Sequence, residues 1–207
     1  MTTSIKVWNP KFIWSDMKAM MAIIICCLLF LSCNNNLSDN GKPEPTEQKY
    51  VLPYPIGKAY ACTQGFNMSP SHTGTFIYSV DFGMSIGTLV TAARSGRVVY
   101  IVESYSDDDQ TGGHENVVII LHEDSTYARY VHLTNKGALV QINQMVVPGD
   151  TVGWSGNSGS TGGPHLHFDV TKTFTGKSDQ TIPFDFINTK SHPVGLERGV
   201  LYEALPY

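Results

Sequence analysis

Short runs of β-branched and aromatic residues, each about as long as a strand, follow one another along the chain after residue 50. The first two of the clearest runs are short and rich in β-branched residues, as strands are. The last two alternate between apolar and polar positions, as in a strand with one face in the core. These four runs are residues 97–103, 117–122, 127–133 and 165–170.

Turn-forming sequences separate these runs, as at residues 123–126 and 147–150. A polar loop, 104–116, contains three consecutive aspartates at 107–109, which we interpret as a solvated tip. A calcium site there is less favoured, because the glycine and glutamate of an EF-hand loop are missing. No segment after the first 50 residues keeps a helical period over ten or more positions. The pattern therefore predicts an antiparallel all-β domain over residues 50–207.

The first part of the chain differs from the rest. Residues 19–31 form an apolar run that is too short for an ordinary membrane span of about 20 residues. Three lysines precede this run, as in a secretory signal, and Ser32-Cys33 follows it in the manner of a bacterial lipoprotein signal. We predict a signal peptide over 1–32, with translation starting at Met1 or Met17, and a disordered tether over 33–49.

Processing at this signal would change what the cysteines can do. Cys33 would become the lipidated first residue, so the protein is expected to be exported and anchored to a membrane, facing the periplasm or the cell wall. Cys26 and Cys27 would leave with the signal, and Cys62 would remain as a lone thiol. We expect Cys62 to be a buried, small apolar residue rather than a nucleophile.

Composition narrows the possible partners. Only 15% of residues are charged, which argues against a coiled coil and against charge-driven disorder. The formal net charge is −4, whereas a nucleic-acid partner would normally require a basic surface. We therefore expect no nucleic-acid partner.

The histidines carry the clearest chemical signal. His165 and His167 flank one residue of a predicted strand, so both imidazoles point to the same face. Two convergent imidazoles suit a metal or hydrolytic site, although two exposed strand histidines are an alternative. A glycine-rich segment, 154–163, leads into this pair, and His132 closes another predicted strand. Two further candidates lie upstream: His72 and Asp81.

Other interpretations explain fewer residues. His165, His167 and Asp169 share one strand face and could form the two-histidine, one-carboxylate site of an iron oxygenase, but this leaves His72 and His132 without a role. The glycine-rich segment is not followed by a lysine or a helix, as a phosphate cradle would be. We expect it instead to let the backbone approach a substrate. The remaining histidines are expected to be structural (His122) or on the surface (His114, His192).

Several short motifs follow one another along the chain: Gln64-Gly65-Phe66, Ser69-Pro70-Ser71-His72, Val80-Asp81-Phe82, Gly87-Thr88-Leu89-Val90, Tyr130-Val131-His132-Leu133 and Gly162-Gly163-Pro164-His165-Leu166-His167-Phe168. Taken in this order, they resemble the motifs of the lysostaphin-like (LytM-type) zinc endopeptidases, which cut peptidoglycan peptides. The resemblance covers about residues 60–172, with a closing strand near 181–186.

The resemblance implies a fold and a set of roles. The fold would be an antiparallel sandwich or open barrel of the duplicated hybrid motif type. Zn²⁺ would be held by His72, Asp81 and His167, and His132 and His165 would form the catalytic pair. Two histidines and one carboxylate leave an open zinc position for water, as catalytic sites require. The substrate would be a peptidoglycan peptide.

Two positions depart from the family pattern. Eight residues separate His72 from Asp81, where many members have three, so we expect a hairpin with a bend at Thr73-Gly74. Phe66 lies about where some members carry a tyrosine that supports the oxyanion. The alternative function is that of a catalytically inactive relative that binds the wall or a partner and regulates another hydrolase. All five polar positions are filled, which favours the enzyme.

Overall fold

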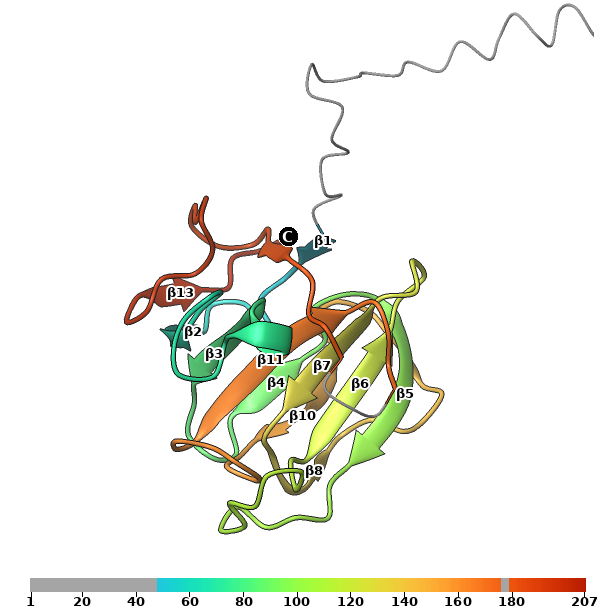
Figure 1. The fold of residues 1–207 in the computed structure, drawn as a ribbon. Coiled ribbons are helices and arrows are strands. Elements are labelled where there is room, and N and C mark those ends of the chain that lie inside the picture. The colour runs from blue at the N-terminus through green and yellow to red at the C-terminus, as the bar shows by residue number, and fades with distance from the viewer. Residues whose placement is uncertain (1–47, 176–178) are drawn as a thin grey trace, which may run out of the picture. The chain divides into compact units, whose positions relative to one another are not determined.

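A computed structural model describes residues 48–175 and 179–207 of the chain (Figure 1). The predicted signal peptide and Cys33 lie outside the described residues, as does the predicted tether up to residue 47. The described residues belong to one compact unit. Within the described ranges, no helix is long and apolar enough to cross a membrane.

The largest sheet has eight strands, and every neighbouring pair in it is antiparallel. In spatial order the strands are β13 (Leu201–Glu203), β2 (Ala59–Gln64), β3 (Ser79–Gly83), β11 (His165–Thr171), β7 (Tyr127–Val131), β6 (Val117–Leu121), β5 (Gly96–Val102) and β9 (Met145–Val146). The central strands β3, β11 and β7 lie side by side (Figure 1). Residues far apart in the sequence therefore meet at the middle of this sheet.

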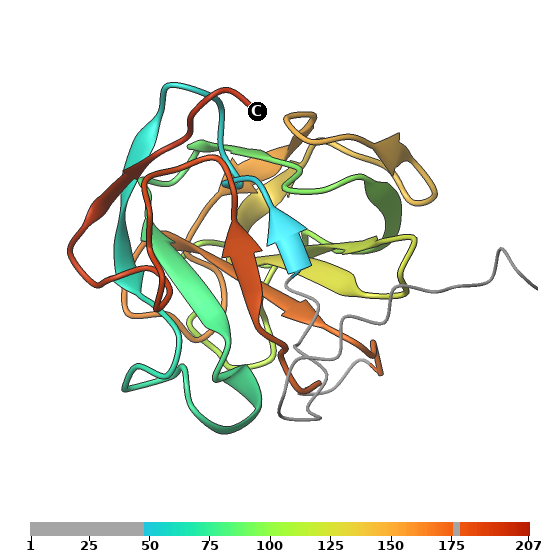
Figure 2. The same cartoon turned by 90° about the horizontal axis from the view of Figure 1, so that it is seen from above.

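Two smaller sheets complete the described structure. A three-stranded antiparallel sheet joins β4 (Leu89–Thr91), β10 (Thr151–Ser155) and β8 (Leu133–Ala138). A two-stranded parallel sheet joins β1 (Gln48–Tyr50) to β12 (Phe184–Phe186), and the view from above shows the two side by side (Figure 2). A short 3-10 helix, η2 (Gly74–Phe76), is the helical element in the described ranges. The predicted all-β class is confirmed, with one parallel pair in an otherwise antiparallel arrangement.

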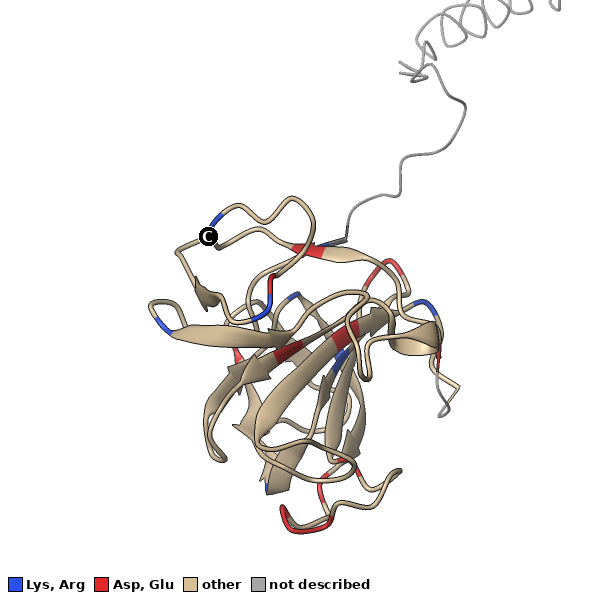
Figure 3. Ribbon diagram, turned by 60° about the vertical axis from the view of Figure 1, so that its left-hand side comes forward, with Lys and Arg blue, Asp and Glu red and all other residues tan. Residues whose placement is uncertain are grey.

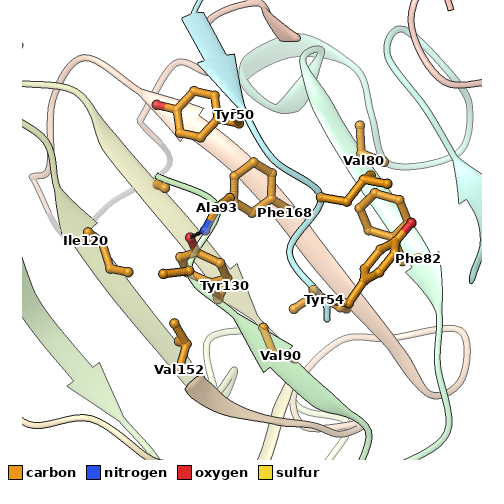
Figure 4. Close-up of a cluster of buried hydrophobic side chains, with 14 of the residues drawn as sticks. Tyr50, Tyr54, Val80, Phe82, Val90, Ala93, Ile120, Tyr130, Val152 and Phe168 are labelled. Atoms are coloured by element: carbon orange, nitrogen blue, oxygen red, sulfur yellow. Dashed lines mark hydrogen bonds between the residues drawn. The ribbon is translucent and has the colours of Figure 1, made fainter. Parts of the chain in front are cut away.

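The core lies where the eight-stranded and three-stranded sheets face each other. Ile120, Tyr130 and Phe168 from the large sheet and Val90 and Val152 from the small one are all fully buried (Figure 4). Along β7, the buried residues Ala128 and Tyr130 alternate with partly exposed ones, as in a strand with one face in the core. The phenol of Tyr130 accepts a hydrogen bond from the backbone N–H of Ala93 at 2.8 Å, so its buried polar atom is satisfied.

One predicted strand differs from the observed structure in an informative way. The run 127–133 is divided into β7 and β8 at His132, whose φ is +63°. A non-glycine residue in the left-handed region is uncommon and is stabilised only by its surroundings. The chain therefore turns sharply at one of the candidate catalytic residues and passes from one sheet to the other.

Candidate functional site

The eight-stranded sheet brings four of the five candidate residues together. In the β3–β11 pair, Asp81 lies directly opposite His167, and His165 projects from the same face of β11 two residues earlier. Residue Val131, the last of β7, pairs with His167 on the other side, so His132 follows within reach. The antiparallel register is thus the reason that these side chains converge.

His72 reaches the same point from the connection between β2 and β3. The expected bend is present, because Gly74 has φ of +57°, but the expected hairpin is wrong. The chain instead makes one 3-10 turn, η2, before entering β3. The eight residues between His72 and Asp81 thus include this short turn and the start of β3, and His72 is fully buried.

The carboxylate of Asp81 is the centre of the cluster. Its Oδ1 lies 2.9 Å from Nδ1 of His167, 3.2 Å from Nε2 of His72 and 3.6 Å from Nε2 of His165. The possible ligand atoms form two overlapping sets, and within each set all atoms lie within 4.8 Å of one another. One set is His72, Asp81 and His167, and the other is His132, His165 and His167. The first set is the one that the family resemblance implies.

The hydrogen bonds around His72 test whether a cation fits there. Its Nδ1 lies 2.9 Å from the carbonyl oxygen of Gly65, which can only accept, so Nδ1 carries the proton. Nε2 is therefore a lone pair in the neutral ring, and it is buried without a hydrogen-bond partner. A lone pair that faces a carboxylate oxygen is repelled unless a cation lies between them. The donor set of two imidazoles and one carboxylate therefore fits Zn²⁺.

The other two histidines are held by the glycine-rich segment. Nδ1 of His132 donates to the carbonyl of Ser158 and Nδ1 of His165 to that of Gly163, each at 2.8 Å. Because both Nδ1 atoms donate, the neutral rings present Nε2 as an acceptor. The two rings are near neighbours, with centroids 4.6 Å apart. The pair can accept a proton or, when protonated, donate one.

Burial controls the charge of this pair. Desolvation, with the neighbouring His165 and His167, lowers the pKa of His132 to about 3. Desolvation also lowers the pKa of His165, although Asp81 opposes the change. Both rings are accordingly neutral near pH 7, as a general base must be.

Asp81 and His167 are shifted in the opposite sense. Burial would raise the pKa of Asp81, but the hydrogen bond with His167, the close contact with His72 and the charges of His167 and His165 outweigh it and lower the pKa. Burial would likewise lower the pKa of His167, yet its hydrogen bonds with Asp169 and Asp81 raise the pKa to about 9. The ionised carboxylate of Asp81 therefore favours a positive charge next to it.

Sequence reasoning did not identify Asn116, which supports His132 from behind. Its Nδ2 donates to the carbonyls of Leu133 and Tyr105, and its backbone N–H donates to Oγ of Ser158. Oγ of Ser158 in turn donates to the carbonyl of Leu133 at 2.8 Å. These contacts fix both the residue after His132 and the residue whose carbonyl holds its ring. They join segments far apart in the sequence, and no local motif announces them.

The polar loop 104–116 is also more than a solvated tip. Asp107 accepts hydrogen bonds from the backbone N–H of Asn157 and from Oγ1 of Thr134. This carboxylate therefore ties the loop to the glycine-rich segment, so the expectation for 107–109 is wrong at Asp107. Charged positions are sparse on the strands (Figure 3). The buried carboxylates of Asp81, Asp169 and Asp179 each have hydrogen-bond partners.

A groove of about 1070 Å³ opens over the cluster. Asp81, His132, His165 and His167 line it, whereas the buried His72 does not. Apolar side chains of β6 and β7 form part of its lining, together with the aromatic rings of Phe76, Tyr100, Tyr105 and Phe174. Phe66 does not line this groove, since it packs against Tyr78 and Phe184.

The other expectations for single residues were met except for His192. Cys62 is buried, and burial raises the pKa of its thiol to about 12. His122 is buried and structural, and His114 is partly exposed beside Asp109. The side chain of His192 is only 7% exposed, and its Nε2 lies 2.6 Å from Oδ1 of Asp185. It is therefore not a surface residue.

Comparison with known protein families matches residues 75–181, just over half of the chain, to "Peptidase family M23". His72 precedes the matched segment. Lysostaphin of Staphylococcus simulans is 32% identical over 120 residues, which cover 58% of this chain and 23% of lysostaphin. The peptidoglycan DD-endopeptidase ShyA of Vibrio cholerae is 32% identical over 130 residues, which cover 59% and 27%.

The match thus spans about a quarter of the length of these curated relatives. Among solved structures, the catalytic domain of lysostaphin from Staphylococcus simulans is 28% identical. The match covers 60% of this chain and 87% of that domain, with a TM-score of 0.43.

Proposed function

Because the chain belongs to peptidase family M23, we propose that it is a zinc-dependent endopeptidase that hydrolyses peptide cross-links or stem peptides of bacterial peptidoglycan. The observation that carries this proposal is the convergence of His72, Asp81 and His167 on one point, with His132 and His165 beside it. The similarity to a peptidoglycan DD-endopeptidase supports the substrate class.

In this proposal His72, Asp81 and His167 hold the metal. Bound Zn²⁺ would supply a Lewis acid that polarises the scissile carbonyl and lowers the pKa of a bound water toward about 7. Nε2 of His132 and Nε2 of His165 can orient the attacking water and accept its proton, or, once protonated, donate to the developing oxyanion. The Ser158 and Gly163 carbonyls keep the proton of each ring on Nδ1, so that Nε2 is free for these roles.

A panel of variants tests this assignment in the purified protein. His72→Ala and His167→Ala should lose bound zinc and cleavage together. His132→Ala and His165→Ala should keep close to one zinc per chain while the release of new amine groups from peptidoglycan falls by about 10²- to 10⁴-fold. Loss of zinc from both of the latter variants would mean that the roles are exchanged.

The same panel separates the enzyme from a catalytically inactive relative. An inactive relative would bind peptidoglycan and release no amine groups, even with zinc bound. Cleavage that persists in full after chelation, or in His167→Ala, would refute the metal-dependent mechanism. His192→Ala is the matched control, because His192 is a buried histidine paired with Asp185 in a different contact network.

We also propose that the protein is exported and anchored through lipid on Cys33, which the sequence of the leader supports. Cys33→Ser should move the protein from the membrane fraction to the soluble fraction of cells. If the variant stays with the membrane, or if the mature N-terminus lies elsewhere, the lipoprotein proposal is wrong.

A further inference from the structure

Asp169 is a fully buried carboxylate that contacts a candidate metal ligand but is not one of the five candidate residues. It follows His167 by two residues on β11, so both side chains project from the same face of the strand. Oδ2 of Asp169 lies 2.9 Å from Nε2 of His167. A carboxylate accepts hydrogen bonds, so Nε2 is the donor in this pair.

Arg129 fixes the position of that carboxylate. It pairs with Asp169 across the β7–β11 register, and its guanidinium donates from Nε to Oδ1 at 2.6 Å and from Nη2 to Oδ2 at 2.7 Å. Its Cζ lies 5.7 Å from the centroid of the Phe76 ring. Two parallel hydrogen bonds from a planar group define the orientation as well as the place of the carboxylate.

The consequence for His167 is a defined tautomer. A proton held on Nε2 by Asp169 leaves Nδ1 as the ring nitrogen that a metal can use. Nδ1 is the atom that faces Oδ1 of Asp81. Nε2, by contrast, faces the carboxylate of Asp169 that Arg129 holds.

We propose that Asp169, oriented by Arg129, is a positioning residue that holds His167 in the tautomer and ring orientation in which Nδ1 binds the metal. This inference rests on the zinc site of the proposed function. Carboxylates in this outer position also make the histidine a stronger ligand, and their loss typically weakens metal binding by about 10–100-fold. The pair further explains why Asp169 does not act as a ligand itself, since both of its oxygens are engaged.

The test is a measurement of zinc affinity by competition with a chelator of known affinity, on the full chain. Asp169→Asn should bind zinc about 10–100-fold more weakly than the unmodified protein. Thr171→Val is the matched control on the same strand, because the Thr171 hydroxyl is buried and donates only to the carbonyl of Thr173. The control should keep the zinc affinity of the unmodified protein. Equal affinity in Asp169→Asn, or equal weakening in the control, would overturn the proposal.

A second variant removes the effect of unpaired charge. Asp169→Asn combined with Arg129→Gln deletes both buried charges, so it avoids a lone guanidinium that could prevent folding. If orientation matters, the double variant should still bind zinc at least about tenfold more weakly. If it regains the affinity of the unmodified protein, the effect was electrostatic and the positioning role is wrong.

The ring itself provides a readout that does not depend on turnover. In a ¹⁵N spectrum of the zinc-loaded protein, His167 should show one protonated nitrogen, Nε2, and one metal-bound nitrogen, Nδ1. In Asp169→Asn this single pattern should be replaced by exchange between two forms. An unmodified protein that binds no zinc would refute the proposed function, whereas one that binds zinc through Nε2 of His167 would refute only this inference.

Discussion

Replacing His122 with glutamine should make the stability of the protein less sensitive to acid. His122 is 3% exposed, its Nδ1 donates to the carbonyl of Ser95 at 2.8 Å, and its ring packs edge-on against Tyr50. Burial, with a smaller contribution from the charge of Arg94, lowers the pKa of His122 to about 4, while Ser95 and Asp124 oppose the change. The folded protein therefore resists a proton that the unfolded chain accepts.

The sign and size follow from proton linkage. The ordinary pKa of histidine is 6.5, so below that pH the unfolded chain binds a proton that the folded protein does not. Stability is fully present above pH 6.5 and is lost as the pH falls toward 4. At about 1.4 kcal/mol for each unit of pKa, the full loss is about 3 kcal/mol, of which about 2 kcal/mol falls between pH 7.5 and pH 5.

Urea denaturation at a series of pH values measures this loss. Both proteins are unfolded in excess chelator, so that acid release of metal does not enter the comparison. His122→Gln keeps a neutral donor for the Ser95 carbonyl and has no group that titrates in this range. The unmodified protein should lose about 2 kcal/mol more than the variant between pH 7.5 and pH 5. Parallel curves for the two proteins would show that the reasoning about burial is wrong.

Three further predictions concern the loop support, the thiol and the core. Gly159 has φ of +77°, and a Cβ there would lie 2.5 Å from Cγ of Glu115. Gly159→Ala should therefore slow cleavage by up to about a hundredfold while zinc stays bound, whereas Gly112→Ala, with no atom closer than 3.9 Å, should not. Native Cys62 should resist iodoacetamide at pH 8 and react once urea is added, as peptide mapping would show; rapid native labelling would contradict its burial. Phe168→Ala should lower the free energy of unfolding by about 3–5 kcal/mol in urea titrations, and a loss below about 1 kcal/mol would contradict the packing.

The strands could be predicted because each is a local pattern. The runs 97–103, 117–122 and 165–170 correspond to β5, β6 and β11 within one residue at each end. The run 127–133 was predicted as one strand, since nothing in its alternation indicates the left-handed backbone of His132. That conformation depends on contacts from Asn116 and Ser158, which are distant in sequence.

The site could be predicted only as a set of residue types. Strand periodicity placed His165 and His167 on one face, and the family resemblance supplied the roles of the other candidates, His72, Asp81 and His132. The supporting contacts could not be predicted, because they depend on strand order. Arg129 meets Asp169 only because β7 and β11 are neighbours in the sheet. Asp107 reaches Asn157 only because the fold brings the loop 104–116 against the glycine-rich segment 154–163.

Hydrolysis of a defined cross-linked peptidoglycan fragment in H₂¹⁸O, followed by mass spectrometry, tests the central claim most directly. The zinc-loaded protein should convert the fragment into two peptides, with one ¹⁸O atom in the new carboxylate. Chelation should abolish the reaction, and added zinc should restore it. An intact fragment in the presence of zinc-loaded, folded protein would contradict the proposed endopeptidase.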